Sequence, residues 1–184
     1  MTRMQAMANH PKRTLGVLAL VLAAVGVAVG SGADFSASSA NPGNTFTAGT
    51  LTMSNSKDNA AIFTASNMKP GDSTTGTVDI ENTGSLAGTF TLTRTALSNS
   101  DATNPMADKI NLVIEDCGTD GTCDGSDTVI YNGTLSGMGS SPYALGNFPA
   151  GVEHRYEFRA TFDSSAGNAY QGDNSSAVFP WNAA

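Results

Sequence analysis

Apolar and polar side chains alternate along several short stretches of this chain. The clearest is Glu153–Phe162, where every second residue from Tyr156 onward is apolar and the residues between them are polar. Successive side chains of a β-strand point to opposite faces, so this pattern predicts a strand with one buried face. Residues 77–81 follow the same pattern, with Val78 and Ile80 directed inward.

Further stretches show a weaker form of this pattern and are separated by turn residues. Proline and glycine punctuate the chain at residues 69–72 (KPGD) and 82–85 (NTGS), as β-turns require. Beyond the N-terminal apolar run, no apolar stripe with a period of 3.6 residues extends beyond one turn. The additional predicted strands are residues 46–53, 61–65, 88–95, 110–115, 128–131 and 177–181.

Short strands with one apolar face each favour two antiparallel sheets packed face to face. The sequence leaves no room for the crossover helices of a parallel sheet. We therefore expect an all-β protein, an antiparallel β-sandwich of jelly-roll type. Its expected core consists of Val78, Ile80, Phe90, Leu92, Leu112, Ile114, Tyr156, Phe158 and Phe162.

The N-terminus has the organisation of a secretory signal peptide. Basic residues precede an uncharged apolar run over residues 15–29, and small residues follow it. We expect cleavage between Ala33 and Asp34; the alternative is an uncleaved membrane anchor, because the run is just long enough to span a bilayer. The predicted parts are a signal peptide (1–33), an extended segment (34–44) and a jelly-roll domain (45–184).

Removal of residues 1–33 would leave a strongly acidic protein. Three of the nine basic side chains and none of the 16 acidic ones lie in that segment, so the mature chain has six basic and 16 acidic side chains, a formal net charge of −10. Such a charge favours solubility and argues against binding to nucleic acids or to anionic membrane surfaces. We expect membrane contact only through the signal peptide before cleavage.

The mature part contains two cysteines, Cys117 and Cys123, and they lie in an acidic stretch. An even cysteine count in an exported protein predicts a disulfide, with two free thiols as the alternative. Residues 115–127 contain five carboxylates, which makes a flexible Ca²⁺ loop conceivable. The spacing does not match an EF-hand, so a solvated hairpin end is the favoured interpretation. The weak Ca²⁺ candidates are Asp116, Asp120, Asp124 and Asp127.

Catalytic chemistry has little support in these residues. A catalytic zinc ion usually takes three protein ligands, often histidines, whereas the mature chain has a single histidine, His154, and no HExxH motif. No Gly-x-Ser-x-Gly motif marks a nucleophilic serine. We interpret His154 as an exposed residue at the start of its strand, and we expect neither enzymatic activity nor a cofactor.

Four stretches, in order along nearly the whole chain, resemble the TasA/camelysin family of secreted biofilm-fibre proteins. They are a phenylalanine-bearing segment after the signal peptide (34–36, DFS), residues 44–51 (NTFTAGTL), the turn at 68–72 (MKPGD) with residues 80–86 (IENTGSL), and the C-terminal YQGD (170–173) and FPWNA (179–183). The middle, residues 98–150, matches least, and its cysteine loop is not a feature of the family.

The resemblance implies an exported jelly-roll subunit that polymerises into matrix or cell-surface fibres. In such fibres the N-terminal segment is thought to complete a neighbour's sheet, which here assigns assembly to Asp34, Phe35, Ser36 and Ala37. The implied partners are other copies of the chain, a signal peptidase, and other matrix or cell-surface proteins. Some members are labelled metallo-endopeptidases. The alternatives are therefore a secreted metallo-endopeptidase and a monomeric, Ca²⁺-dependent surface-binding module.

Overall fold

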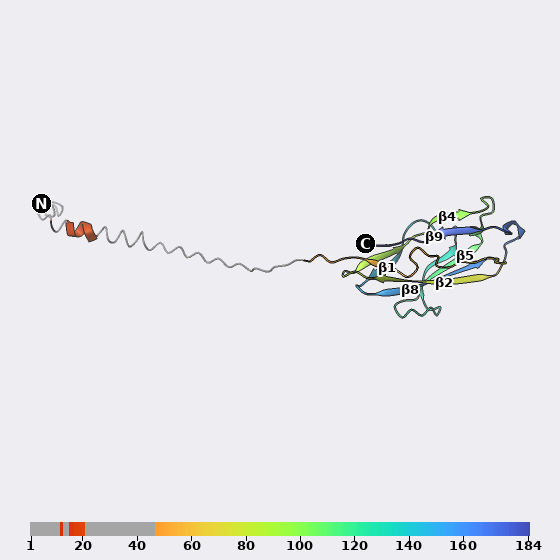
Figure 1. Ribbon diagram of the computed structural model, residues 1–184, viewed down its shortest axis with the longest axis horizontal. Coiled ribbons are helices and arrows are strands. Elements are labelled where there is room, and N and C mark those ends of the chain that lie inside the picture. The colour runs from red at the N-terminus through yellow and green to blue at the C-terminus, as the bar shows by residue number, and fades with distance from the viewer. Residues whose placement is uncertain (1–11, 13–14, 21–46) are drawn as a thin grey trace. The chain divides into compact units, whose positions relative to one another are not determined.

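The computed structural model describes residues 12, 15–20 and 47–184. The chain divides into two units, Met1–Phe46 and Thr47–Ala184 (Figure 1). The predicted cleavage site and the extended segment 34–44 lie outside the described residues. In the first unit, residues 15–20 are helical. Among the residues described, no helix combines the length and the apolar character that crossing a membrane requires.

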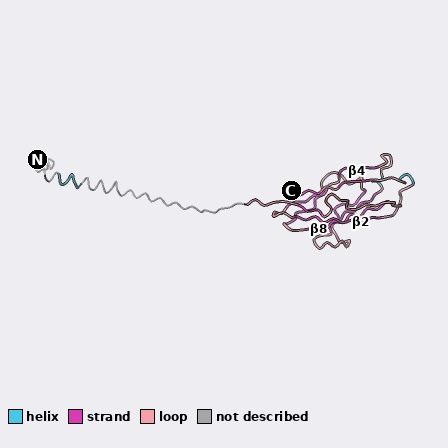
Figure 2. Tube along the Cα trace, viewed as in Figure 1, coloured by secondary structure: helices cyan, strands magenta, loops and turns pink. Residues whose placement is uncertain are grey.

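The regular structure of the second unit consists almost entirely of strands, joined by loops (Figure 2). Every strand pair is antiparallel. This confirms the predicted all-β, antiparallel fold class. Two short 3-10 helices, η1 (Met106–Asp108) and η2 (Asn168–Tyr170), lie in connections. The strands are β1 (Met53–Asn55), β2 (Ser73–Asn82), β3 (Gly88–Leu92), β4 (Thr95–Asn99), β5 (Ile110–Asp116), β6 (Thr128–Thr134), β7 (Tyr143–Phe148), β8 (Glu153–Phe162), β9 (Ser175–Val178) and β10 (Trp181–Ala183).

The strands form a five-stranded sheet in the order β1-β2-β8-β5-β6, a three-stranded sheet β10-β3-β7 and a two-stranded sheet β4-β9. Strand β8 is central to the larger sheet. It pairs with β2 from Glu153 to Thr161 and with β5 from Tyr156 to Phe162. Strand β8 therefore has a neighbouring strand on each side. Its alternating apolar and polar side chains reflect one face that packs against the core.

The core lies between the larger sheet and the three-stranded sheet. Apolar side chains of β2, β5 and β8 belong to one buried cluster with those of β3, β7 and β10. Aromatic rings join the two layers: Tyr156 lies 5.0 Å from Trp181 between ring centroids, and Phe158 lies 5.1 Å from Phe179. All nine side chains of the expected core are buried. The two sheets thus pack as in a sandwich, and the jelly-roll connectivity stays a prediction.

Two predicted strands are interrupted in the structure. Residues 88–95 divide into β3 and β4, and residues 177–181 divide into β9 and β10. The breaks are neighbours, because the Thr93 N–H donates to the Pro180 carbonyl (2.9 Å). Pro180 has no N–H to offer a ladder. On the opposite strand, Ala96 has a φ of 47° where the register shifts.

Three other segments differ from the sequence-based expectation. Of the predicted strand 46–53, residues 47–52 form no ladder and only Met53 belongs to a strand. Residues 61–65 form no strand at all. Conversely, β7 was not predicted, because Gly146, with a φ of 107°, and Asn147 interrupt the apolar alternation of this strand.

Candidate functional site

The connection between β5 and β6 carries the cysteines and most of the acidic residues; we call residues 117–127 the disulfide loop. Cys117 and Cys123 form a disulfide, as predicted. Three of the Ca²⁺ candidates accept a hydrogen bond from a backbone N–H of this loop. Asp120 accepts from Thr122 (2.9 Å), Asp124 from Ser126 (3.0 Å) and Asp127 from Asp124 (2.9 Å). Bonds from Ser126 lower the pKa of Asp124. The carboxylates thus stabilise turns, as in a hairpin end.

The geometry of the loop offers little to a metal ion. In the part of the chain that the structure describes, one group of three potential ligands comes within 4.8 Å, and it consists of Cys117, Cys123 and Asp127. Both sulfurs belong to the disulfide, so neither is available as a thiolate ligand. Asp116 likewise accepts from a loop N–H, that of Gly118 (2.8 Å), and it also contacts His154. Ca²⁺ binding by the four carboxylates stays a prediction.

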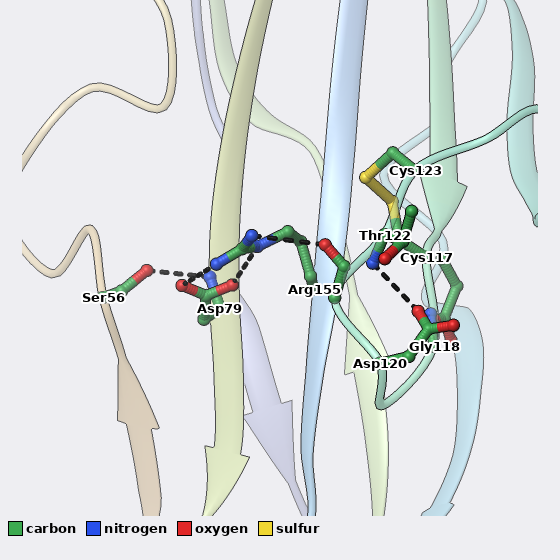
Figure 3. A network of polar contacts seen from close by, with 10 residues as sticks. Ser56, Asp79, Cys117, Gly118, Asp120, Thr122, Cys123 and Arg155 are labelled. Atoms are coloured by element: carbon green, nitrogen blue, oxygen red, sulfur yellow. Dashed lines mark hydrogen bonds and ion pairs between the residues drawn. A yellow bond between two sulfur atoms is a disulfide. The ribbon is translucent and has the colours of Figure 1, made fainter.

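Arg155 of β8 fastens the disulfide loop to the larger sheet (Figure 3). Its Nε and Nη2 donate to the two carboxylate oxygens of Asp79 on β2 (2.7 and 3.2 Å), and its Nη1 donates to the Gly121 carbonyl (3.2 Å). The Asp79 N–H donates in turn to the Ser56 hydroxyl (2.7 Å). The hydrogen bonds that Arg155 donates to Asp79, together with the negative charge of Asp79, raise the pKa of Arg155. One guanidinium therefore links the loop, β8 and β2.

The main chain reinforces this attachment. The Cys117 N–H donates to the Arg155 carbonyl (2.8 Å), and the Arg155 N–H donates to the Gly118 carbonyl (3.2 Å). These bonds continue the β5–β8 ladder by one further step beyond the end of β5 at Asp116. The disulfide loop is consequently held at both its base and its tip.

On the opposite face of β8, His154 pairs with Asp116. The Nδ1 atom of His154 lies 2.9 and 3.0 Å from the two carboxylate oxygens, and its ring stacks on Phe148 with 4.3 Å between centroids. Only 23% of the His154 side chain and 11% of the Asp116 side chain are exposed. His154 lies at the start of β8, as expected, but the interpretation of it as an exposed residue is wrong.

A sequence signal for this pair existed. His154 precedes Tyr156 by two positions on β8, and Asp116 follows Ile114 by two positions on β5, so the strand period places both with the buried face. The register also pairs Asp116 directly with Tyr156. Extending the alternation by one step at each strand end therefore places both side chains on the buried face, while their contact depends on β5 and β8 being neighbours.

Tyr156 extends this polar group into the core. Its side chain is fully buried, and its hydroxyl has no hydrogen-bond partner among the described residues. Burial, followed by the negative charge of Asp116, raises the pKa of Tyr156. Both causes disfavour the phenolate, so the folded protein holds this hydroxyl in the neutral form.

Replacing Tyr156 by Phe is expected to change the alkaline stability more than the stability at pH 7. The unfolded tyrosine ionises near pH 10 while the folded one stays neutral, so above that pH the wild-type protein loses about 1.4 kcal/mol of stability per pH unit through this group. At pH 7 the loss of an unpaired hydroxyl costs little. Urea unfolding at pH 7 and pH 11 measures both effects.

Tyr170→Phe, in the surface helix η2, is the control. It should retain the wild-type difference between the two pH values. If the stability of Tyr156→Phe changed with pH as much as that of the wild type, the pKa of Tyr156 would be the same in the folded and unfolded protein, and the prediction would be wrong.

The described residues do not fit a catalytic zinc ion. His154 is the one histidine among them, its Nδ1 is occupied by Asp116, and no group of three potential ligands there includes it. A carboxylate that hydrogen-bonds to a histidine ring also occurs at metal sites, but there further protein side chains bind the metal ion as well. The arrangement is instead a largely buried, hydrogen-bonded histidine–carboxylate pair.

Comparison with known proteins agrees with the quoted motifs up to residue 86, whereas the C-terminal motifs at 170–173 and 179–183 lie outside the matched range. The sequence model of the family described as camelysin metallo-endopeptidase matches residues 11–142, which is more than half of the chain. Among curated proteins, none matches. The match covers the N-terminal segment, the turns around β2 and the whole of the disulfide loop. The chain belongs to the camelysin family.

Proposed function

We propose that this protein is a secreted structural subunit that assembles into extracellular or cell-surface fibres of a biofilm matrix. Assembly proceeds by strand donation: residues 34–44 of one copy, freed by cleavage after Ala33, add to a sheet of the next copy. Its principal partner is another copy of the same chain, and other matrix or cell-surface proteins are secondary partners.

The observation that carries the proposal is the combination of family membership with an antiparallel sandwich that offers sheet edges. An extended segment that joins a sheet edge gains main-chain hydrogen bonds along its length, while alternate side chains enter pockets. A donor at one place and an acceptor at another form a head-to-tail contact, which produces a filament when it does not close into a ring. The acidic charge of the mature chain favours solubility until assembly.

A metallo-endopeptidase is the second candidate, because the family description names that activity. The residues weigh against it. His154 is engaged with Asp116, and both cysteines are in a disulfide. The monomeric Ca²⁺-dependent module has less support, since the carboxylates of the disulfide loop bind N–H groups of the loop itself.

Electron microscopy of the protein secreted from cells that express the full chain tests the proposal. We expect filaments, and we expect the same preparation to hydrolyse no casein in a chelator-sensitive manner. Monomers at all concentrations would contradict the structural role. Casein hydrolysis that disappears both with chelator and in His154→Ala would establish the protease instead.

A further inference from the structure

The connection between β1 and β2, residues 57–72, crosses the sandwich without becoming part of a sheet; we call it the strap. Within it, residues 61–68 make no backbone hydrogen bond to another described residue. Asn59, just before this stretch, and Asn67, near its end, have φ values of 55° and 53°. Asparagine is one of the few residues that adopt this left-handed conformation readily. The strap is therefore an extended segment between two sharp changes of direction.

Two apolar side chains anchor the strap. Ile62 and Phe63 are partly buried against the core, and the Phe63 ring lies 6.4 Å from that of Phe158. Their backbone lies directly on Gly76 of β2, where a Cβ atom would overlap the Ile62 carbonyl oxygen and would come within 2.8 Å of the Phe63 Cβ. Gly76 precedes the buried Val78 by two positions, so the strap lies on the inward face of β2.

Beside the strap, strand β2 has an edge without a strand partner. Strand β8 pairs with β2 from Ser73 to Glu81 on one side. On the other side β1 covers only Ile80–Asn82, and the Ser56 N–H reaches Asp79. Residues 73–78 thus have no ladder partner on that side in the described part of the chain. Such an edge accepts an added strand unless something covers it.

We infer that the strap is a gate over an acceptor site, formed by the 73–78 edge of β2 and the Gly76 surface, for residues 34–44 of a second copy. This inference rests on the proposed function and names its acceptor. When the donor arrives, the strap moves away from Gly76, and the donor adds to the β2 edge. Phe35, the one bulky side chain of the donor, then takes the place that Phe63 occupied.

The register of β1 favours a donor from another copy. Met53 pairs with Asn82 and Asn55 with Ile80, so the chain enters the domain at the Asn82 end of β2 and runs toward Ser73. Before that point, Thr50 is bonded to Ser85, beyond the end of β2. The entry point and the open edge therefore lie at opposite ends of the same strand, which is the geometry that a head-to-tail polymer requires.

A strap locked by a second disulfide tests the gate. In Phe63→Cys/Gly76→Cys the two Cβ positions start 2.8 Å apart. A disulfide needs roughly 3.5–4.5 Å, so the strap must shift by about 1 Å to accept the bond. We expect oxidised full-chain protein to be secreted and folded but unable to elongate wild-type filament seeds, and reduction to restore elongation. Wild-type protein in the same reductant is the control, since it loses only the Cys117–Cys123 bond.

A second variant leaves β2 unchanged and loosens the strap. Phe63→Ser should elongate the same seeds faster by about tenfold, equivalent to about 1.4 kcal/mol of strap closure. Thr64→Ala, at an exposed strap position, should match the wild type. If wild-type filaments form and both the locked and the loosened proteins elongate at the wild-type rate, the gate is wrong and the fibre function stands. If no wild-type filaments form, the proposed function itself fails.

Discussion

Secreted protein that lacks residues 34–44 is expected to form no filaments while its domain remains folded. The segment has one large apolar side chain, Phe35, among small and polar residues. Burial of a phenylalanine contributes about 1.5–3 kcal/mol and each main-chain hydrogen bond about 0.5–1.5 kcal/mol, against about 1–2 kcal/mol per ordered backbone residue. Because the favourable and unfavourable free energies nearly cancel, loss of the Phe35 side chain should be enough to prevent filament formation. Electron microscopy and sedimentation measure it.

Single substitutions sharpen this prediction. Phe35→Ser should abolish filaments as the deletion does, whereas Phe35→Leu, which keeps an apolar anchor, should retain them. The truncated protein keeps the β2 edge and the strap, so a small amount of it should stop the growth of wild-type filaments by capping them. A truncated protein that polymerised like the wild type would refute donation by this segment.

Replacement of Asn82 by Ala should destabilise the domain by about 3–5 kcal/mol, because the buried Phe148 carbonyl and two partly buried backbone groups, the Leu86 carbonyl and the Gly84 N–H, lose their partner. Asn82 is fully buried. Its amide donates to the carbonyls of Leu86 and Phe148 (2.8 Å each) and accepts from the Gly84 N–H (3.0 Å). The side chain thereby joins the β2–β3 turn to the end of β7. Urea unfolding followed by tryptophan fluorescence measures the loss.

Asn147→Ala is the matched control, because Asn147 is an exposed asparagine in neighbouring β7. It should change stability by less than about 0.5 kcal/mol. Asn82→Asp should also destabilise strongly, since it removes both donors and buries a carboxylate. If Asn82→Ala unfolded within 1 kcal/mol of the wild type, on the scale of one ordinary hydrogen bond, the turn would not depend on this amide.

The regular alternation in β2, β5 and β8 was sufficient to predict the main strands, the antiparallel all-β fold class and the core. In these strands the local preference and the tertiary environment agree, because each has one face in the core. The disulfide could also be predicted from the sequence, since the chain has only two cysteines and both follow the predicted signal peptide. The motifs likewise pointed to the camelysin family.

The sequence alone also determined that this chain contains no HExxH motif, because that is a matter of residue order. Contacts between distant segments were decided only in the tertiary structure. Residues 61–65 have a strand-like composition, yet the strap lies on Gly76 because a glycine 11 or more residues away leaves room for its backbone. His154 meets Asp116 only because β5 and β8 are neighbours in the sheet. Local alternation encodes which face of a strand is buried, but not which segment covers that face, since that choice depends on packing among residues far apart in the chain.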